Sequence, residues 1–275
     1  MGEPVRAKRV SLRPGLIVAW LIILLVLAWI ALPGLFTSQN PLLGNLAVRL
    51  ESPSGAHIFG TDELGRDLFA RVVNGSRASV GSAALAVALG LAVGGPVGLV
   101  AGFAGGWADD LLMRTMDLLL AIPSILLSMA VITAWGEGTV KVSFAVGLGS
   151  VATIARTMRS EVVRVRIADY IDAARAGGVR QPVILIRHVL PNSWRPVMVL
   201  ATLQFGYAIL AVAALSFLGY GTQPPAPSWG ELVSDGSNYL ATSWWLVTLP
   251  GIVVVALVLA INHVARSLTS RGGNR

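Results

Sequence analysis

The sequence contains no cysteine, and this absence limits the chemistry open to the chain. Without thiols there is no disulfide framework, no thiolate metal site and no cysteine nucleophile. The three histidines, His57, His188 and His263, lie in separate regions and form no His-Glu-x-x-His motif. No serine lies in a Gly-x-Ser-x-Gly motif with histidine support. We therefore expect neither catalytic nor metal-binding residues in this chain.

Lysine is almost as scarce, since only Lys8 and Lys141 occur and neither follows a glycine. The phosphate-binding loop of P-loop ATPases requires Gly-Lys-Ser/Thr, so this chain cannot contain one. We expect no cofactor in the chain. If ATP drives its function, another subunit must bind and hydrolyse the nucleotide.

Charged residues make up only 13% of the 275 residues, whereas 55% are hydrophobic. A soluble domain carries roughly 25% charged residues, so the composition predicts a polytopic membrane protein in a lipid bilayer. The net charge of +7 could indicate nucleic-acid binding. Lys and Arg on the cytoplasmic loops of a membrane protein explain it better, and we expect no nucleic-acid partner.

Six stretches are apolar enough to cross a bilayer, which requires about 20 residues per helix. They are Leu16–Leu32, Val80–Phe103, Leu111–Ala134, Thr139–Thr157, Arg195–Leu218 and Trp245–Val264. The fourth stretch needs Lys141 and Arg156 to extend toward the interfaces from its two ends. The predicted fold is an all-α membrane protein with six transmembrane helices.

The distribution of positive charge supports six crossings. With both termini in the cytoplasm, most of the 21 Lys and Arg residues lie inside, as the positive-inside rule requires. Without the fourth crossing, the arginines of residues 156–195 would lie outside. Pro33-Gly34-Leu35-Phe36 offers no small-residue cleavage site, so we expect the first stretch to be a retained membrane anchor.

Residues 170–191 read YIDAARAGGVRQPVILIRHVLP and lie in the expected cytoplasmic loop between the fourth and fifth crossings. The pattern predicts a helix from about Ser160 to Ala176 that Gly177-Gly178 ends, since glycine tolerates positive φ. A second helical piece is expected from Pro182, with Pro191 marking the turn into the fifth crossing. An ordinary amphipathic loop is the alternative interpretation.

This loop resembles the EAA signature of ABC-importer permeases: Glu-Ala-Ala, three residues, Gly, nine residues, Ile, one residue, Leu-Pro. The matching residues are Asp172, Ala173, Ala174, Gly178, Leu190 and Pro191, whereas Asp172 replaces Glu and His188 replaces Ile. The resemblance implies a type I ABC-importer permease fold. It also implies that the loop is a cytoplasmic coupling helix, which docks on an ATPase subunit.

Two further stretches resemble the C-type permease of dipeptide and oligopeptide importers, a family that includes nickel-chelate permeases. They are Phe59–Ser79, which contains FGTDELGRD, and Leu215–Gly236. The resemblance implies a multi-pass subunit of the bacterial plasma (inner) membrane that forms half of a translocation pathway. It implies four kinds of partner: a second homologous permease subunit, two ABC ATPase subunits that bind ATP and magnesium, an extracytoplasmic substrate-binding protein and the bilayer. Nickel chelates or haem remain alternative substrates, and a stand-alone secondary transporter is an alternative function.

Two groups of charged residues are candidate sites. Asp62, Arg66 and Asp67 lie in the expected extracytoplasmic segment, either as a docking or gating surface or as a loop stabilised by its own ion pairs. If this segment is helical, the spacing of four residues pairs Asp62 with Arg66. Arg114 and Asp117 are three residues apart in the third crossing, where we expect an intramembrane ion pair. Pro123 should kink this crossing. For Trp229, in the loop after the fifth crossing, we expect a structural role in a rigid loop, with an anchor at the membrane interface as the alternative.

The expected organisation follows from these assignments. Residues 1–15 form a cytoplasmic N-terminus, 16–36 the first transmembrane helix, 37–78 an extracytoplasmic segment, 79–266 an ABC transmembrane type-1 domain with five helices and a coupling loop at about 158–194, and 267–275 a cytoplasmic tail.

Overall fold

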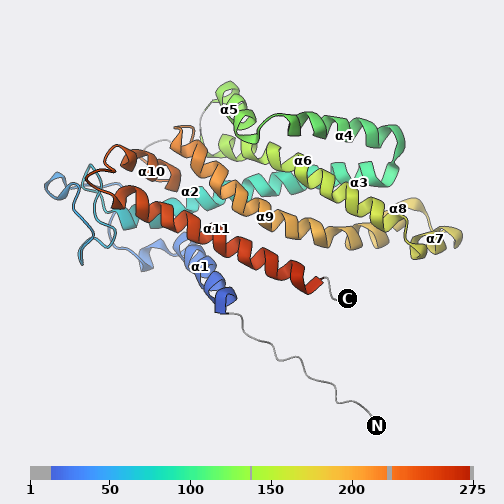
Figure 1. The fold of residues 1–275 in the computed structure, drawn as a ribbon, viewed down its shortest axis with the longest axis horizontal. Coiled ribbons are helices and arrows are strands. Elements are labelled where there is room, and N and C mark those ends of the chain that lie inside the picture. The colour runs from blue at the N-terminus through green and yellow to red at the C-terminus, as the bar shows by residue number, and fades with distance from the viewer. Residues whose placement is uncertain (1–13, 137, 222–224, 273–275) are drawn as a thin grey trace, which may run out of the picture.

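The computed structural model describes residues 14–136, 138–221 and 225–272, and every regular element in these residues is a helix (Figure 1). The α-helices are α1 (Pro14–Ala31), α2 (Leu68–Leu89), α3 (Gly95–Ala104), α4 (Gly106–Ala121), α5 (Ser124–Trp135), α6 (Thr139–Arg166), α7 (Asp169–Ala176), α8 (Gln181–Ile184), α9 (Leu190–Phe217), α10 (Trp229–Ser237) and α11 (Trp245–Gly272). Short 3-10 turns occur at Pro33–Leu35 and Leu46–Val48, and π-helical turns at Gly90–Gly94 and Leu185–Val189. The predicted all-α class is confirmed. The basic N-terminal residues before Pro14 lie outside the described residues.

Four helical stretches are long and apolar enough to cross a membrane: Pro14–Ala31, Leu68–Ala104, Gln181–Phe217 and Trp245–Ser267. The pair α4 and α5 is a fifth candidate, with a bend of 91° between its two helices. These five overlap five of the six stretches predicted from the sequence. The remaining prediction, Thr139–Thr157, falls within α6, a helix of 28 residues.

The helices extend beyond the charge-free windows of the sequence. The second stretch begins at Leu68 rather than near Val80, because α2 includes Arg71, whose side chain is buried. The fifth begins at Gln181 rather than near Arg195, and α9 continues through Pro196. Pro191 lies in the first turn of α9, where proline is tolerated, so the predicted turn at this residue is wrong.

The bend between α4 and α5 lies at Ile122 and Pro123. Ile122 has an extended backbone (φ −93°, ψ 128°), the conformation that a following proline favours. The predicted effect of Pro123 is therefore confirmed, although the result is a break rather than a kink. The Ser124 hydroxyl lies 2.5 Å from the Tyr207 hydroxyl, which ties the start of α5 to α9.

Helix α6 lies at the centre of the bundle and packs against α2, α3, α4, α5 and α9. Helix α3 and the π-helical turn before it approach α6 through one face that carries Gly94, Gly98 and Gly102. A Cβ atom at Gly98 would lie 2.2 Å from the Ala155 carbonyl oxygen of α6. In a bilayer the hydrophobic effect does not drive helices together, so helix association depends on close packing, which small residues permit.

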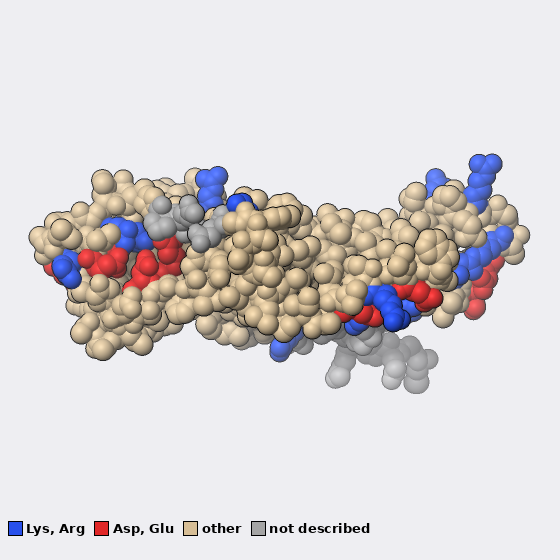
Figure 2. Space-filling model, turned by 90° about the horizontal axis from the view of Figure 1, so that it is seen from above, with Lys and Arg blue, Asp and Glu red and all other residues tan. Residues whose placement is uncertain are grey.

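Charged side chains gather at the two ends of the molecule, as Figure 2 shows, whereas the middle is almost entirely uncharged. The end that holds α10 and the loops of residues 37–67 is here called the α10 end (Figure 1). The opposite end, with α7 and α8, is called the α7 end. An apolar band between two charged ends is the arrangement that a bilayer requires.

Candidate functional site

The segment between α6 and α9 forms the tip of the α7 end. Helix α6 ends at Arg166, and α7 begins at Asp169 after a short turn. The predicted continuous helix from Ser160 to Ala176 is therefore wrong. The chain turns at Ile167 and Ala168. No glycine or proline lies at this turn, so the sequence gives no signal for it.

Helix α7 ends at the two glycines, as predicted, in a Schellman motif. The Val179 N–H donates to the Ala174 carbonyl at 3.1 Å, and the Gly178 N–H donates to the Arg175 carbonyl at 3.0 Å. Only Gly178 has a positive φ, of +78°, so it is the glycine that the turn requires. The next helix begins at Gln181 with Pro182 in its first turn, which confirms the predicted second piece.

A small hydrophobic core fixes α7 and α8 to the long helices. Ile171 of α7, Ile184 of α8 and Val189 before α9 are fully buried. They cluster with Val162 and Val165 of α6 and with other apolar residues of α6 and α9. The tip is therefore packed against both α6 and α9.

The outer face of the tip carries the EAA-like residues. The Asp172 side chain is 66% exposed and accepts a hydrogen bond from the Arg175 guanidinium at 2.9 Å. Ala173 and Gly178 are exposed and Ala174 is half-buried, so the surface beside the carboxylate has little bulk. Pro191 is exposed at the start of α9, whereas Leu190 packs against the core of the tip. This face presents a carboxylate on a flat surface.

Two ion pairs join α4 to α6 near the tip. The Arg159 guanidinium donates to both oxygens of Asp109, at 2.6 Å from Nη2 to Oδ2, and the Arg156 guanidinium pairs with Asp117. The predicted pair of Arg114 with Asp117 is therefore wrong. Helical spacing permits it, but Asp117 meets an arginine of the neighbouring helix, 39 residues along the chain.

Ion pairs and hydrogen bonds join several charged residues of the α10 end. The Arg66 Nε donates to Asp62 Oδ2 at 2.6 Å, which confirms the predicted pairing, although these residues lie in a turn rather than a helix. Asp67 caps α2 by accepting from the Ala70 N–H at 2.7 Å, and its other oxygen lies 2.8 Å from His57 Nδ1.

Asp62, Arg66 and Asp67 are nearly inaccessible, with 4%, 9% and 7% exposure. Of the two interpretations of these residues, this burial favours a loop held by its own ion pairs. Trp229 is completely buried, which supports the structural role expected of it rather than that of an interface anchor. Its indole N–H donates to the Val72 carbonyl at 2.9 Å and thereby fixes α10 on α2.

Glu231 is the most perturbed acid of the α10 end. Burial and the neighbouring Asp235 carboxylate raise the pKa of Glu231 to about 7 from its ordinary value of 4.5, although Arg71 and Arg66 oppose the shift. The folded state therefore binds this proton more tightly than the unfolded state does. The free energy of unfolding must fall as the pH rises from about 4.5 through 7.

A Glu231→Gln variant should remove this pH dependence. We expect it to unfold at a higher temperature than the unmodified chain at pH 8, and at a similar temperature at pH 5, because the unmodified side chain is then protonated. Thermal unfolding of the detergent-purified chain at both pH values measures the difference. An equal difference at pH 5 and pH 8 would contradict the assignment.

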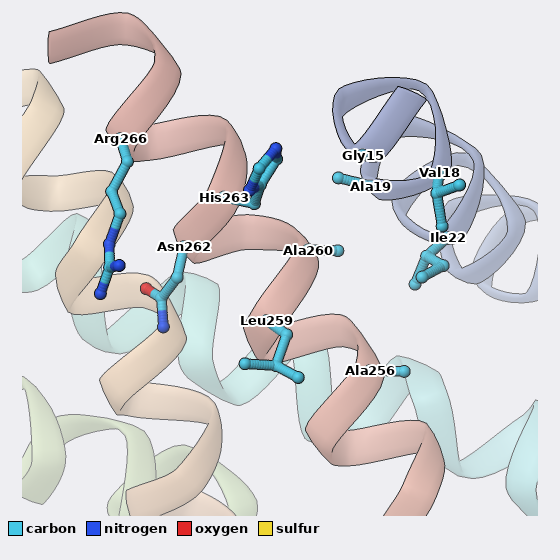
Figure 3. Close-up of a pocket in the computed structure, with 10 residues that line it drawn as sticks. All are labelled: Gly15, Val18, Ala19, Ile22, Ala256, Leu259, Ala260, Asn262, His263 and Arg266. Atoms are coloured by element: carbon cyan, nitrogen blue, oxygen red, sulfur yellow. The ribbon is translucent and has the colours of Figure 1, made fainter. Parts of the chain in front are cut away.

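A groove of about 490 Å³ lies between α1 and α11. Figure 3 shows the His263 ring between the two helices, whereas Asn262 and Arg266 point away from α1. The remaining lining is mostly alanine and aliphatic side chains. The polar groups do not converge, so this groove has no catalytic arrangement. The described residues also contain no group of three or more His, Asp or Glu side chains that could hold a metal ion.

Comparison with known proteins identifies the family of this chain. Residues 94–271 match the family model described as "binding-protein-dependent transport system inner membrane component". The chain belongs to this family. The resemblance to ABC-importer permeases that the sequence carries is thereby confirmed.

Relatives of this permease are named for peptide transport. It is 40% identical over 234 residues to the dipeptide transport system permease protein DppC of Alkalihalophilus pseudofirmus, covering 85% of this chain and 77% of that protein. It is 38% identical over 244 residues to the probable D,D-dipeptide transport system permease protein DdpC of Escherichia coli, covering 89% and 82%.

A solved structure shares the fold of the permease. The MetNI methionine ABC transporter, in an inward-facing conformation, aligns with a TM-score of 0.58. The alignment covers 73% of this chain and 97% of the other at 18% identity, so it supports the fold alone.

Proposed function

We propose that this permease is the transmembrane subunit of an ATP-binding-cassette importer for dipeptides and oligopeptides in the bacterial inner membrane. The observation that carries the proposal is the match of residues 94–271 to the transport family, together with near-full-length relatives named for dipeptide transport. The chain performs no covalent chemistry. Partner ATPase subunits bind ATP and magnesium and hydrolyse the nucleotide.

The subunit crosses the membrane six times, an even number, so both of its termini lie on the same side, in the cytoplasm. The fourth crossing is α6, and the partners of its charged side chains support this assignment. Near its start the Lys141 ammonium donates to the Trp135 carbonyl at 2.6 Å. Toward its other end Arg156 and Arg159 pair with carboxylates of α4. Paired charges of this kind are tolerated at the margins of a membrane.

The tip of the α7 end is the coupling helix of this proposal. Its exposed face, with Asp172 and Ala173, docks in a groove of an ATPase subunit. The buried Ile171 and Ile184 then carry the movement of the ATPase into α6 and α9 as rigid-body motion. The Schellman motif at Gly178 fixes the angle between α7 and α8.

The complete importer contains a second homologous permease subunit, two ATPase subunits and an extracytoplasmic substrate-binding protein. Each permease forms half of the translocation pathway. The domain limits follow the sequence expectation, with residues 37–78 outside the cell and residues 79–266 as the transport domain. The exposed apolar residues of α1, α4, α5 and α9 face either lipid or the second permease.

Uptake of a labelled dipeptide tests this function. The complete complex is reconstituted in liposomes with ATP, and uptake is measured for the unmodified chain and for Asp172→Arg. We expect ATP-dependent uptake that falls about tenfold or more in the variant, because reversing a charge at a docking surface costs several kcal/mol. Glu51→Arg, the same reversal at an exposed residue of the α10 end, should leave uptake nearly unchanged. Uptake by this chain alone under an ion gradient would contradict the proposal.

A further inference from the structure

A cleft of about 330 Å³ lies at the α10 end, outside the tip and its ion pairs. Its walls come from α10, the first turn of α2 and the turn at residues 63–66. Figure 2 shows acidic and basic side chains side by side at this end of the molecule. The lining residues are Glu63, Leu64, Arg66, Arg71, Pro225, Glu231, Asp235, Asn238 and Tyr239.

The acidic residues of the cleft outnumber their cationic partners. Arg66 is engaged by Asp62 and Glu63, at 2.6 Å and 2.9 Å, and Arg71 lies 3.5 Å from the same Asp62. Glu231 and Asp235 form no ion pair within 4.0 Å in the described part of the chain. They are four residues apart on α10, so both carboxylates lie on the same face of that helix.

Two buried polar atoms of the cleft lack hydrogen bonds. Arg71 is 1% exposed, and its Nε makes no hydrogen bond although Asp62 lies near. The Glu231 Oε2 atom is also buried without a partner. A buried polar group without a partner destabilises a protein, so a group that forms a hydrogen bond with either atom would stabilise the site.

We propose that this cleft binds the zwitterionic backbone of a short peptide, with the α-ammonium group on Glu231 and Asp235 and the carboxylate toward Arg71. This inference rests on the proposed function for the choice of a peptide. The site carries both signs of charge within a small volume, which fits a dipeptide better than a lysine side chain of a protein partner. The walls of Leu64, Pro225 and Tyr239 suit an organic ligand, and the described residues include no group of three or more acidic or histidine side chains placed to hold a metal ion.

Protonation of the carboxylates should compete with the ammonium group. Glu231 faces Asp235 on its own helix, Arg71 on α2, Arg66 in the turn, and the backbone of Ser228. Its pKa of about 7 means that much of its charge is lost at pH 6 and present at pH 8. Peptide binding should therefore be tighter at pH 8 than at pH 6.

Calorimetric titration of the purified full-length chain in lipid nanodiscs tests the proposal, with Leu-Leu and N-acetyl-Leu-Leu as probes. We expect Leu-Leu to bind about tenfold or more tightly than the acetylated peptide, because a charge-assisted hydrogen bond is lost on acetylation. Glu231→Gln and Asp235→Asn should each weaken Leu-Leu binding by a similar factor. Glu51→Gln, which removes an exposed carboxylate at the same end, should not.

Equal affinities for the two peptides, or unchanged affinity in both cleft variants, would overturn the inference. Because this titration needs neither ATP nor the partner subunits, its failure leaves the uptake experiment unaffected. Conversely, absence of ATP-driven uptake would contradict the proposed function even where Leu-Leu binds in the cleft.

Discussion

A Gly98→Val variant is expected to lose about 4 kcal/mol or more of the free energy of unfolding, a loss that only severe steric or burial defects produce. The first added atom would lie 2.2 Å from the Ala155 carbonyl oxygen and 2.8 Å from the Met158 Cβ. Both belong to α6, whose backbone cannot yield without displacing α2, α5 and α9. Thermal unfolding of the detergent-purified chain, and the amount of folded protein in membranes, measure the loss.

Gly81→Val provides the matched control for this variant. Gly81 lies in α2, within the same continuous helical stretch, and no atom lies within 4 Å of a Cβ added there. The two substitutions change helix propensity equally, so only the packing differs. We expect the control to change stability by about 0.5 kcal/mol or less. Similar losses in both variants would contradict the close packing of α3 on α6.

Replacing Trp229 by alanine should cost about 3–5 kcal/mol, the range for removing a large buried aromatic side chain. The indole is completely buried, and its N–H donates to the Val72 carbonyl. The Trp229 backbone N–H also donates to the Ser79 hydroxyl at 3.0 Å. Loss of the side chain should therefore release α10 from α2, and limited proteolysis of residues 225–245 should accelerate.

Two further variants separate the contributions of this tryptophan. Trp229→Phe keeps most of the volume but loses the hydrogen bond to the Val72 carbonyl, which keeps its partner within α2, at a cost of about 0.5–1.5 kcal/mol. Trp107 is 78% exposed in the first turn of α4, so Trp107→Ala should have little effect. If Trp229→Ala unfolds no more readily than Trp107→Ala, then α10 is not held by its tryptophan.

The sequence predicts the long helices well because the bilayer imposes a simple rule on them. Charge-free windows locate five stretches that the structure also has, and Pro123 correctly predicts the position of a bend, although not that the helix breaks there. The charge-free windows do not predict where the helices begin and end, because some charged residues lie inside the helices. Arg71 lies inside α2 because Asp62 offsets its charge, and Arg156 and Arg159 lie inside α6 because α4 supplies carboxylates.

Contacts between distant segments account for the features that sequence reasoning missed. Local spacing predicts the pair of Asp62 with Arg66, and the structure contains it. The same reasoning pairs Asp117 with Arg114, whereas the true partner comes from another helix. The cleft of Glu231 and Asp235 depends on Arg71, far away in the chain, so no local pattern could indicate it.

The tip illustrates both outcomes within one segment. Gly178 predicts the end of α7, because a glycine with positive φ is the usual residue at that position of a Schellman motif. The turn at Ile167 and Ala168 carries no such residue. It follows instead from the burial of Ile171 against α6 and α9, which requires α7 to fold back.

Cross-linking from the tip tests the central claim most directly, that α7 docks on an ATPase subunit. The chain has no cysteine, so a single cysteine at exposed Ala173 is the only thiol that it contributes. In membranes that hold the complete importer, a short bifunctional thiol reagent should join Ala173→Cys to an ATPase subunit with a cysteine in its docking groove. The same reagent should not capture the ATPase from Glu51→Cys at the α10 end. Capture from Glu51→Cys but not from Ala173→Cys would contradict the account, because the tip would then lie on the wrong side of the membrane.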